Sequence, residues 1–179
     1  TLLVSARPGL PGELCASHFA RGALDALFHA GQDGWAIYLI GNEEAVALGQ
    51  VSAAEWRRFE ALLLEYLRNH GITIKRCYSA LEHPDGVKTH ARYSVFLLPN
   101  TGLLYHAAQF DGISLRHSWV IGDGTIELVA GWRAGCHIAG IGPDKTFRLG
   151  ELSVEPELVG PSLAHVVADL RAREPVPGR

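Results

Sequence analysis

Asp123 is the residue of this sequence whose type and position most favour chemistry. It stands in the turn Gly122-Asp123-Gly124, between an apolar run at residues 119–121 and a helical pattern. Ligands of open α/β sheets bind outside the carboxyl ends of the strands, so a carboxylate in this turn is well placed to act on one. Aspartate is also a favoured N-cap residue, and capping the following helix is the alternative role for Asp123.

Other polar residues at predicted strand ends extend this candidate site. Asn42, Glu43 and Glu44 follow an earlier apolar run, and Glu127 lies one helical turn after Asp123. The four carboxylates among these residues either gather at the strand ends and hold a cation, or are solvated surface acids.

The segment at about residues 79–99 has no clear helical or strand periodicity. A connection of this length in a compact domain is usually a functional loop or an insertion. An active hydrolase would have to combine Ser5, Asn42, Asp123 and Glu127 with polar side chains of this loop. The loop residues that could contribute are His83, Lys88, His90 and Arg92, for which simple solvation is the alternative.

Composition is typical of a single globular domain. The chain has 179 residues, of which 47% are hydrophobic and 20% charged, and this predicts one domain over residues 1–179. The net charge of −3 gives no reason to expect a nucleic acid or an anionic membrane as partner. No apolar stretch is long enough to span a bilayer, and a signal-peptide pattern is lacking. The widely spaced Cys15, Cys77 and Cys136 favour reduced thiols, and with them a cytoplasmic location.

Apolar runs and helical patterns alternate along the chain. Helical spacing predicts a first helix capped by Ser17 and a second opened by the capping box of Ser52 and Glu55. Further helices are expected at residues 102–110 and 163–171, and after Asp123. Strands are expected at residues 1–4, 35–40, 72–78, 119–121 and 137–139, and more weakly at 146–149. This order predicts an α/β fold with a doubly wound, mostly parallel sheet.

Residues 118–136, SWVIGDGTIELVAGWRAGC, resemble the fourth motif of the haloacid dehalogenase (HAD) superfamily. The likeness is closest to small bacterial phosphatases that act on heptose 1,7-bisphosphate and histidinol phosphate. Residues 35–49, WAIYLIGNEEAVALG, resemble the family's second strand and the TNQSG-type turn after it. Residues 97–119 resemble the RKPxPGML segment and its helix. The resemblance implies a three-layer, Rossmann-like sheet of the HAD type without a large cap domain.

The resemblance also implies where the catalytic residues should lie, and the chain departs from the family at most of these positions. The nucleophile and the general acid are the two aspartates of DxDGT, and alignment by the first predicted strand places Ser5 and Arg7 there. The family's phosphate-binding hydroxyl falls at Gly41, beside the retained Asn42. Its lysine, which neutralises phosphate charge, falls at Leu98.

An alternative alignment takes Thr1 as the threonine of DxDGT. That alignment removes the central strand and exposes the edges of both its neighbours, so we favour the first one. Asp123 is retained on the metal side and Glu127 stands for a second acid, so Mg²⁺ is expected only in an active enzyme. No zinc is expected, because the ligand positions of the family's zinc-binding insert hold Ala80, Glu82, Ser94 and Phe96.

The combined loss of nucleophile, general acid, hydroxyl and lysine predicts a pseudophosphatase, a HAD-fold protein with a binding or interaction role. The alternative is an active phosphoric monoester hydrolase with altered machinery, acting on a phosphorylated small molecule. A third possibility is a subunit that pairs with a protein partner, or with itself, through the loop at 79–99. Its apolar run at residues 95–98 is expected either to fill the former active-site mouth or to form an interface patch.

Overall fold

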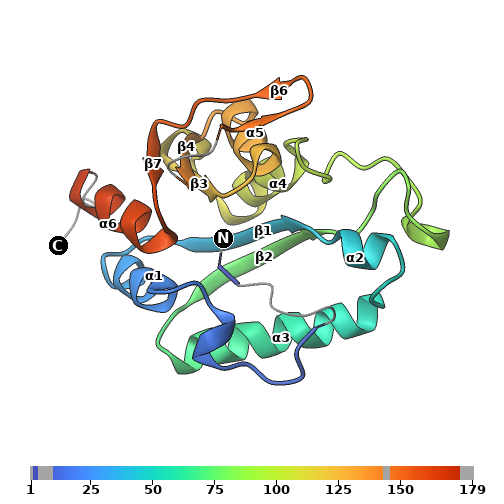
Figure 1. Cartoon of the computed structure of the whole chain (residues 1–179), viewed down its shortest axis with the longest axis horizontal. Helices are drawn as coiled ribbons and strands as arrows, with labels where there is room; N and C mark the ends of the chain where they lie inside the picture. Colours follow the sequence, from blue (N-terminus) through green and yellow to red (C-terminus); the bar gives the residue numbers. More distant parts are fainter. Residues whose placement is uncertain (1, 4–9, 143–145, 174–179) are drawn as a thin grey trace.

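The computed structural model of the chain describes residues 2–3, 10–142 and 146–173 (Figure 1). Two parallel sheets and one short antiparallel hairpin make up its strands. The first sheet pairs β1 (Ile37–Asn42) with β2 (Ile74–Ala80). The second sheet has the order β3-β4-β7 and consists of β3 (Trp119–Gly122), β4 (His137–Ile141) and β7 (Leu158–Gly160). The hairpin consists of β5 (Arg148–Leu149) and β6 (Leu152–Ser153).

Helices alternate with these strands, as the predicted α/β class requires. The helices are α1 (Ala23–Gln32), α2 (Glu44–Ala47), α3 (Ala53–Asn69), α4 (Gly102–Asp111), α5 (Thr125–Arg133) and α6 (Leu163–Arg173). Three short 3₁₀ helices are η1 (Ala16–His18), η2 (Lys88–His90) and η3 (Leu115–His117). The described part of the chain contains no large cap domain between these elements, and none of its helices is long and apolar enough to cross a membrane.

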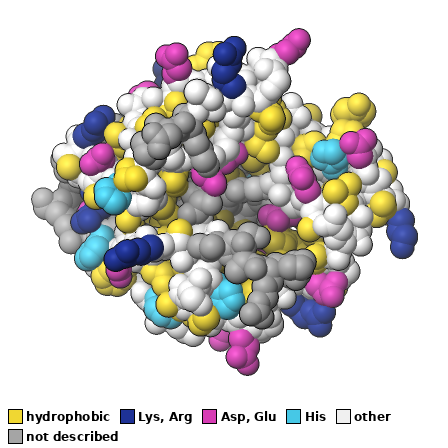
Figure 2. Space-filling view, viewed as in Figure 1, with side chains coloured by type: hydrophobic (Ala, Val, Ile, Leu, Met, Phe, Trp, Pro, Cys, Tyr) yellow, Lys and Arg dark blue, Asp and Glu magenta, His cyan; other side chains and the backbone are white. Residues whose placement is uncertain are grey.

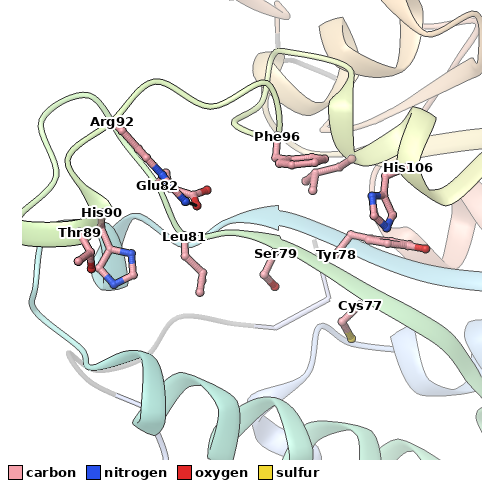
Figure 3. Close-up of a pocket in the computed structure, with 11 residues that line it drawn as sticks. Cys77, Tyr78, Ser79, Leu81, Glu82, Thr89, His90, Arg92, Phe96 and His106 are labelled. Atoms are coloured by element: carbon pink, nitrogen blue, oxygen red, sulfur yellow. Dashed lines mark hydrogen bonds and ion pairs between the residues drawn. The ribbon is translucent and has the colours of Figure 1, made fainter. Parts of the chain in front are cut away.

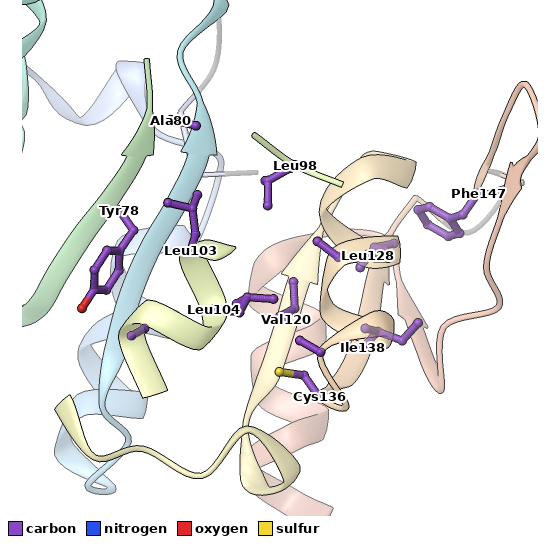
Figure 4. Packing of buried hydrophobic residues seen from close by; sticks show 13 residues of the cluster. Tyr78, Ala80, Leu98, Leu103, Leu104, Val120, Leu128, Cys136, Ile138 and Phe147 are labelled. Carbon is purple, nitrogen blue, oxygen red and sulfur yellow. The ribbon is translucent and has the colours of Figure 1, made fainter. Parts of the chain in front are cut away.

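The helices cover both faces of the sheets and give the molecule three layers. On one face, α4 and α5 bury Leu104 and Leu128 against Val120 of β3 and Ile138 of β4 (Figure 4). On the other face, α1, α3 and α6 contribute to a second hydrophobic cluster, which contains Ala23, Leu27, Leu63, Leu67, Leu163 and Val167. The predicted three-layer α/β architecture with parallel strands is confirmed.

Local sequence signals set the limits of α3. The N–H of Glu55 donates to Ser52 Oγ at 3.2 Å, and the N–H of Ser52 donates to Glu55 Oε2 at 2.8 Å, which confirms the predicted capping box. Gly71 follows the helix with a φ of +74°, a conformation that glycine adopts without strain. The apolar stripe buries Phe59 and Leu63, as helical spacing predicts.

The first predicted strand is the main correction to the expected fold. Leu3 forms an isolated antiparallel bridge with Phe19, and the N–H of Ala20 donates to the carbonyl of Leu2 at 2.9 Å. A central parallel strand at residues 1–4 is therefore wrong at its two described positions, while Thr1 and Val4 lie outside the described residues. The two apolar segments are close in sequence, and pairing with each other lets them bury Phe19 locally.

The described parallel strands form two sheets that contribute to one hydrophobic cluster. Ile40 of β1 and Val120 of β3 contribute to the same hydrophobic cluster, and Figure 4 shows both strands running in the same direction. Within the described ranges, β1 pairs only with β2, and β3 pairs only with β4. Within the described residues, the parallel strands therefore form two separate hydrogen-bonded sheets.

Two smaller predictions at element boundaries are also wrong. Ser17 caps no long helix, because it lies inside η1, and α1 begins at Ala23 after Gly22, whose φ is +73°. The N-cap residue of α5 is Gly124, so Asp123 does not have the alternative role of a helix cap. All six residues of β1 are half-buried. β7 was not predicted, because a strand of three residues is too short to show periodicity.

Candidate functional site

The carboxyl ends of β1 and β3 carry the residues that sequence analysis singled out. The two strands point the same way (Figure 4), so Asn42 at the end of β1 and Gly122 at the end of β3 lie toward the same edge of the layer. Figure 2 shows acidic side chains dispersed among hydrophobic and other side chains on the face that it views. Strand ends of this kind are where α/β proteins usually bind ligands.

Asn42 is joined to the backbone of Leu98 by two hydrogen bonds. Its Nδ2 donates to the Leu98 carbonyl at 3.0 Å, and the Leu98 N–H donates to Asn42 Oδ1 at 2.8 Å. The Leu98 side chain is 4% exposed and packs into the cluster beneath α4 and α5. The position that the resemblance gives to a phosphate-binding lysine therefore holds a buried apolar side chain, and the neighbouring amide is engaged at both its oxygen and its nitrogen.

Glu43 is half-buried behind the end of β1, near Ser79 and Glu60. Burial raises the pKa of Glu43 to about 7, the negative charge of Glu60 adds to this rise, and a hydrogen bond from Ser79 opposes it. Gly41 leaves room for this carboxylate, since a Cβ at that position would lie 3.3 Å from Glu43 Oε1. Glu44, by contrast, is exposed in the first turn of α2.

Asp123 lies in the turn between β3 and α5, and Glu127 lies in the first turn of α5. Asp123 is exposed, and Glu127 folds back so that its Oε1 accepts the N–H of Gly124 at 2.8 Å. The turn needs Gly122, because a Cβ there would lie 2.3 Å from Glu127 Cγ. Mg²⁺ takes about six oxygen ligands, so these two carboxylates do not by themselves make a magnesium site. Across the described residues, no group of three or more His, Cys, Asp or Glu could hold a metal ion.

Ser5 and Arg7 lie outside the described residues, so the structure does not place the two positions aligned with the nucleophile and the general acid. Their assignment depended on a central strand at residues 1–4. Leu2 and Leu3 pair instead with the segment around Phe19, so the two described residues of this segment do not show the strand on which the assignment depended. The assignment of Ser5 and Arg7 stays a prediction.

The positions aligned with zinc ligands are joined by other contacts. Glu82 accepts a hydrogen bond from Arg92 Nη2 at 2.6 Å, and Arg92 holds the pKa of Glu82 below its usual range. The N–H of Phe96 donates to Ser94 Oγ at 3.2 Å, and Ala80 is 1% exposed in the core. An ion pair and backbone contacts thus hold this part of the loop.

The loop residues proposed for an altered hydrolase are not part of the strand-end group. The N–H of His83 donates to the carbonyl of His90 at 3.0 Å, which closes the loop on itself, and Lys88 is exposed. His90 and Arg92 line a recess against β2 and α4, whose walls do not include Asn42 or Asp123. These loop side chains therefore do not join Asn42 and Asp123, although the same recess includes Ser79, whose side chain hydrogen-bonds Glu43.

The apolar run at residues 95–98 is divided between the core and the surface. Leu98 is 4% exposed, whereas Val95 is 67% exposed and Phe96 is 37% exposed. Each of the two expected roles therefore suits a different part of the run. Leu98 fills space beside Asn42, and Val95 adds to the exposed apolar surface.

Sequence comparison finds relatives of this chain among heptose bisphosphate phosphatases. No family model matches the chain. Over 164 residues it is 23% identical to a D-glycero-beta-D-manno-heptose-1,7-bisphosphate 7-phosphatase of Salmonella typhi, covering 90% of this chain and 85% of that protein. A protein of the same name from Mesorhizobium japonicum is 26% identical over 113 residues, covering 63% of this chain and 52% of that protein.

Solved structures agree in fold. A D,D-heptose 1,7-bisphosphate phosphatase from B. bronchiseptica, complexed with magnesium and phosphate, superposes with a TM-score of 0.75 at 22% identity and covers 87% of this chain and 85% of its own. A putative HAD-like phosphatase from Mesorhizobium loti gives a TM-score of 0.78 at 21% identity, with coverages of 96% and 82%. The TM-scores establish a shared fold, and identities this low leave the chemistry to the residues of this chain.

Proposed function

We propose that this chain, a phosphatase-like protein of the HAD superfamily, does not release phosphate by the family's mechanism. Its proposed role is to bind a partner. The contact between Asn42 and Leu98 carries this proposal. A phosphate site needs positive charge and free hydrogen-bond donors. Here a buried leucine replaces the expected lysine, and its backbone engages the one polar side chain retained beside it.

The acidic residues near the end of β1 support the same proposal. The raised pKa of Glu43, about 7, leaves this carboxyl partly ionised at neutral pH, and Glu44 is exposed beside it. Negative charge next to a phosphate pocket opposes the binding of a phosphate dianion. Binding without turnover requires neither Mg²⁺ nor zinc, and we expect no metal cofactor.

The second candidate function is an active phosphoric monoester hydrolase that acts on a phosphorylated small molecule. Its support is the similarity to heptose bisphosphate phosphatases over most of the chain, together with the magnesium and phosphate bound in the B. bronchiseptica structure. Asp123 is the residue of this chain that such an activity would need most, because it keeps the family's position on the metal side.

Phosphate release separates the two candidates. Heptose 1,7-bisphosphate, histidinol phosphate and other sugar phosphates would be incubated with the purified chain, with and without Mg²⁺, beside an Asp123→Asn variant. We expect wild type and variant to release phosphate equally slowly, at the level of a contaminant. Mg²⁺-dependent release that the variant lacks would establish the hydrolase instead. The Salmonella typhi phosphatase serves as positive control for heptose 1,7-bisphosphate.

A further inference from the structure

Cys15, Ser17 and His18 form a cluster of polar side chains just before and inside η1. The Sγ atom of Cys15 lies 3.1 Å from Ser17 Oγ and 3.2 Å from His18 Nδ1. Cys15 and Ser17 are exposed, and His18 is half-buried. A thiol within hydrogen-bond distance of an imidazole and a hydroxyl has the components of an activated nucleophile. Neither of the two candidate functions uses any of these side chains.

The backbone decides which form of the His18 ring faces the thiol. The N–H of Cys15 donates to His18 Nδ1 at 3.1 Å, so Nδ1 carries a lone pair and the ring proton of the neutral imidazole is on Nε2. The thiol of Cys15 therefore faces an acceptor at 3.2 Å. A nitrogen in this position is able to take the thiol proton when the sulfur reacts.

Hydrogen bonds within the cluster also favour the thiolate. The hydroxyl of Ser17 is the main cause that lowers the pKa of Cys15, and the backbone N–H groups of Ser17 and His18 act in the same direction against a small opposing effect of desolvation. The thiolate is the form of cysteine that attacks electrophiles. Cys15 thus combines a stabilised thiolate with exposure to solvent.

The other two cysteines are free as well, but they lack both features. Burial raises the pKa of Cys77 to about 12, and the charges of Glu60 and Glu43 add to this rise. Figure 3 shows Cys77 on β2, among the residues that line the recess. Burial raises the pKa of Cys136 to about 11, and this residue is 8% exposed. A small reagent is therefore expected to react at Cys15 before it reacts at the other two thiols.

We propose that Cys15 is a modification site, at which the chain reacts with low-molecular-weight disulfides of the glutathione type and forms a mixed disulfide. The Cys15 thiolate attacks one sulfur of the reagent, the S–S bond of the reagent breaks, and the other half of the reagent leaves as a thiolate. The proton taken up by His18 passes to this leaving thiolate. The sulfur of Cys15 is oxidised, the leaving sulfur is reduced, and an excess of a small thiol reverses the exchange.

This site goes beyond the proposed function. Its chemistry needs neither the strand-end residues nor the recess beside β2, so its test and the phosphate-release test give independent results. The modification would change the segment that precedes Phe19, because a sulfur bound in a mixed disulfide no longer carries the charge that Ser17 and His18 stabilise.

Incubation with oxidised glutathione, followed by mass spectrometry of the intact chain, tests the proposal. We expect the mass of one glutathione to be added, mapped to Cys15 by proteolysis and removed by dithiothreitol. Cys15→Ser should stay unmodified over the same time, whereas Cys77→Ala should react as wild type does. An adduct that forms first on Cys77 or Cys136, or a disulfide within the chain in place of the adduct, would overturn the proposal.

Reaction rates distinguish an activated thiol from one that is only exposed. Dithiodipyridine releases a coloured product, so its reaction with Cys15 is followed at neutral pH beside N-acetylcysteinamide as a reference thiol. Ser17→Ala and His18→Ala should each slow the reaction of Cys15 by about threefold, since less thiolate is present and its higher nucleophilicity offsets only part of this loss. Ser17→Thr keeps the hydroxyl and should restore the rate.

His165→Ala is the matched control for the histidine variant. His165 Nδ1 also contacts a side chain three residues earlier, but that partner is the hydroxyl of Ser162, at 2.8 Å. This control should leave the rate of Cys15 unchanged, and circular dichroism checks that all variants fold. If Ser17→Ala and His18→Ala react as fast as wild type, or if Cys15 is no faster than the reference thiol, the cluster does not activate Cys15 and the proposal fails.

Discussion

The two parallel sheets of this protein differ in how completely one apolar strand of each, β4 and β1, is buried. In β4, Ile138 is 1% exposed and Ala139 0%, with β3 and β7 paired on either side. In β1, all six residues are half-buried, although its sequence, IYLIGN, is as apolar as the HIAGI of β4. Burial of a parallel strand depends on having neighbours on both sides, and its own apolar sequence does not provide them.

The same contrast continues to the ends of the strands. After β3, the polar turn that holds Asp123 is exposed. After β1, Asn42 is fixed to the backbone of Leu98, and Leu98 is buried. The half of the molecule with the better-buried strand thus keeps the polar strand end, while the other half has filled its strand end with an apolar side chain.

Truncation of one isoleucine in each sheet is the most severe test of this contrast. Ile138→Ala should lower the free energy of unfolding by about 3 to 4 kcal/mol, since it leaves a cavity at a fully enclosed site. Ile40→Ala removes the same atoms from a half-buried position of β1 and should lower it by about half as much. Urea denaturation measures both values. Equal losses would show that the two sheets are equally well packed.

The contact between Asn42 and Leu98 is tested by removing the amide. Asn42→Ala leaves a backbone N–H and a carbonyl without their partners in a partly buried place, and should lower the free energy of unfolding by about 2 kcal/mol. Asn100→Ala is the matched control, because the amide of Asn100 makes an exposed hydrogen bond to the Ser94 carbonyl. A change below about 0.5 kcal/mol is expected for the control. Faster hydrogen exchange of the Leu98 amide should accompany the first change alone.

Glu43 makes the stability of the β1 half depend on pH. Its pKa is raised from 4.5 to about 7 in the folded protein, so the folded state holds a proton that the unfolded state has lost between these values. The free energy of unfolding should therefore fall as pH rises from about 5 to 7. Glu43→Gln should remove about 1 to 2 kcal/mol of this fall, a value reduced because the carboxyl is partly solvated.

Thermal unfolding followed from pH 5 to pH 8 measures this effect. The variant Glu44→Gln, at the exposed neighbouring position, should leave the pH dependence unchanged. If Glu43→Gln and wild type lose stability in parallel over this range, the burial of Glu43 is less than the structure indicates.

Signals carried by neighbouring residues were sufficient to predict most elements of the fold. The box of Ser52 and Glu55 placed the start of α3, and Gly71 its end. The signals failed where distant residues compete for a segment. Ser17 looks like a helix cap, yet Phe19 just after it is taken up by the bridge to Leu3. Pairing of this kind depends on contacts that periodicity does not report.

The candidate site shows the same limit. The motif around Asp123 could be recognised, because its glycines and acids are adjacent in sequence. The bond between Asn42 and Leu98 could not, since its partners are 56 positions apart. The recess beside β2 was also missed, because it combines a strand edge, a loop and a helix. The segment at residues 79–99, which lacks helical or strand periodicity, was the one signal in the sequence that indicated this recess.

The ion pair of Glu82 and Arg92 makes one wall of the recess beside β2 and α4 sensitive to salt and pH. The Arg92 side chain is 66% exposed, so rising ionic strength screens its attraction for Glu82. The lowered pKa of Glu82 means that the pair persists at neutral pH and is lost in acid, as the pH falls through that lowered value. Salt and acid therefore both weaken the ion pair of Glu82 and Arg92. This ion pair, and the wall of the recess that it holds, is most stable at low ionic strength and neutral pH.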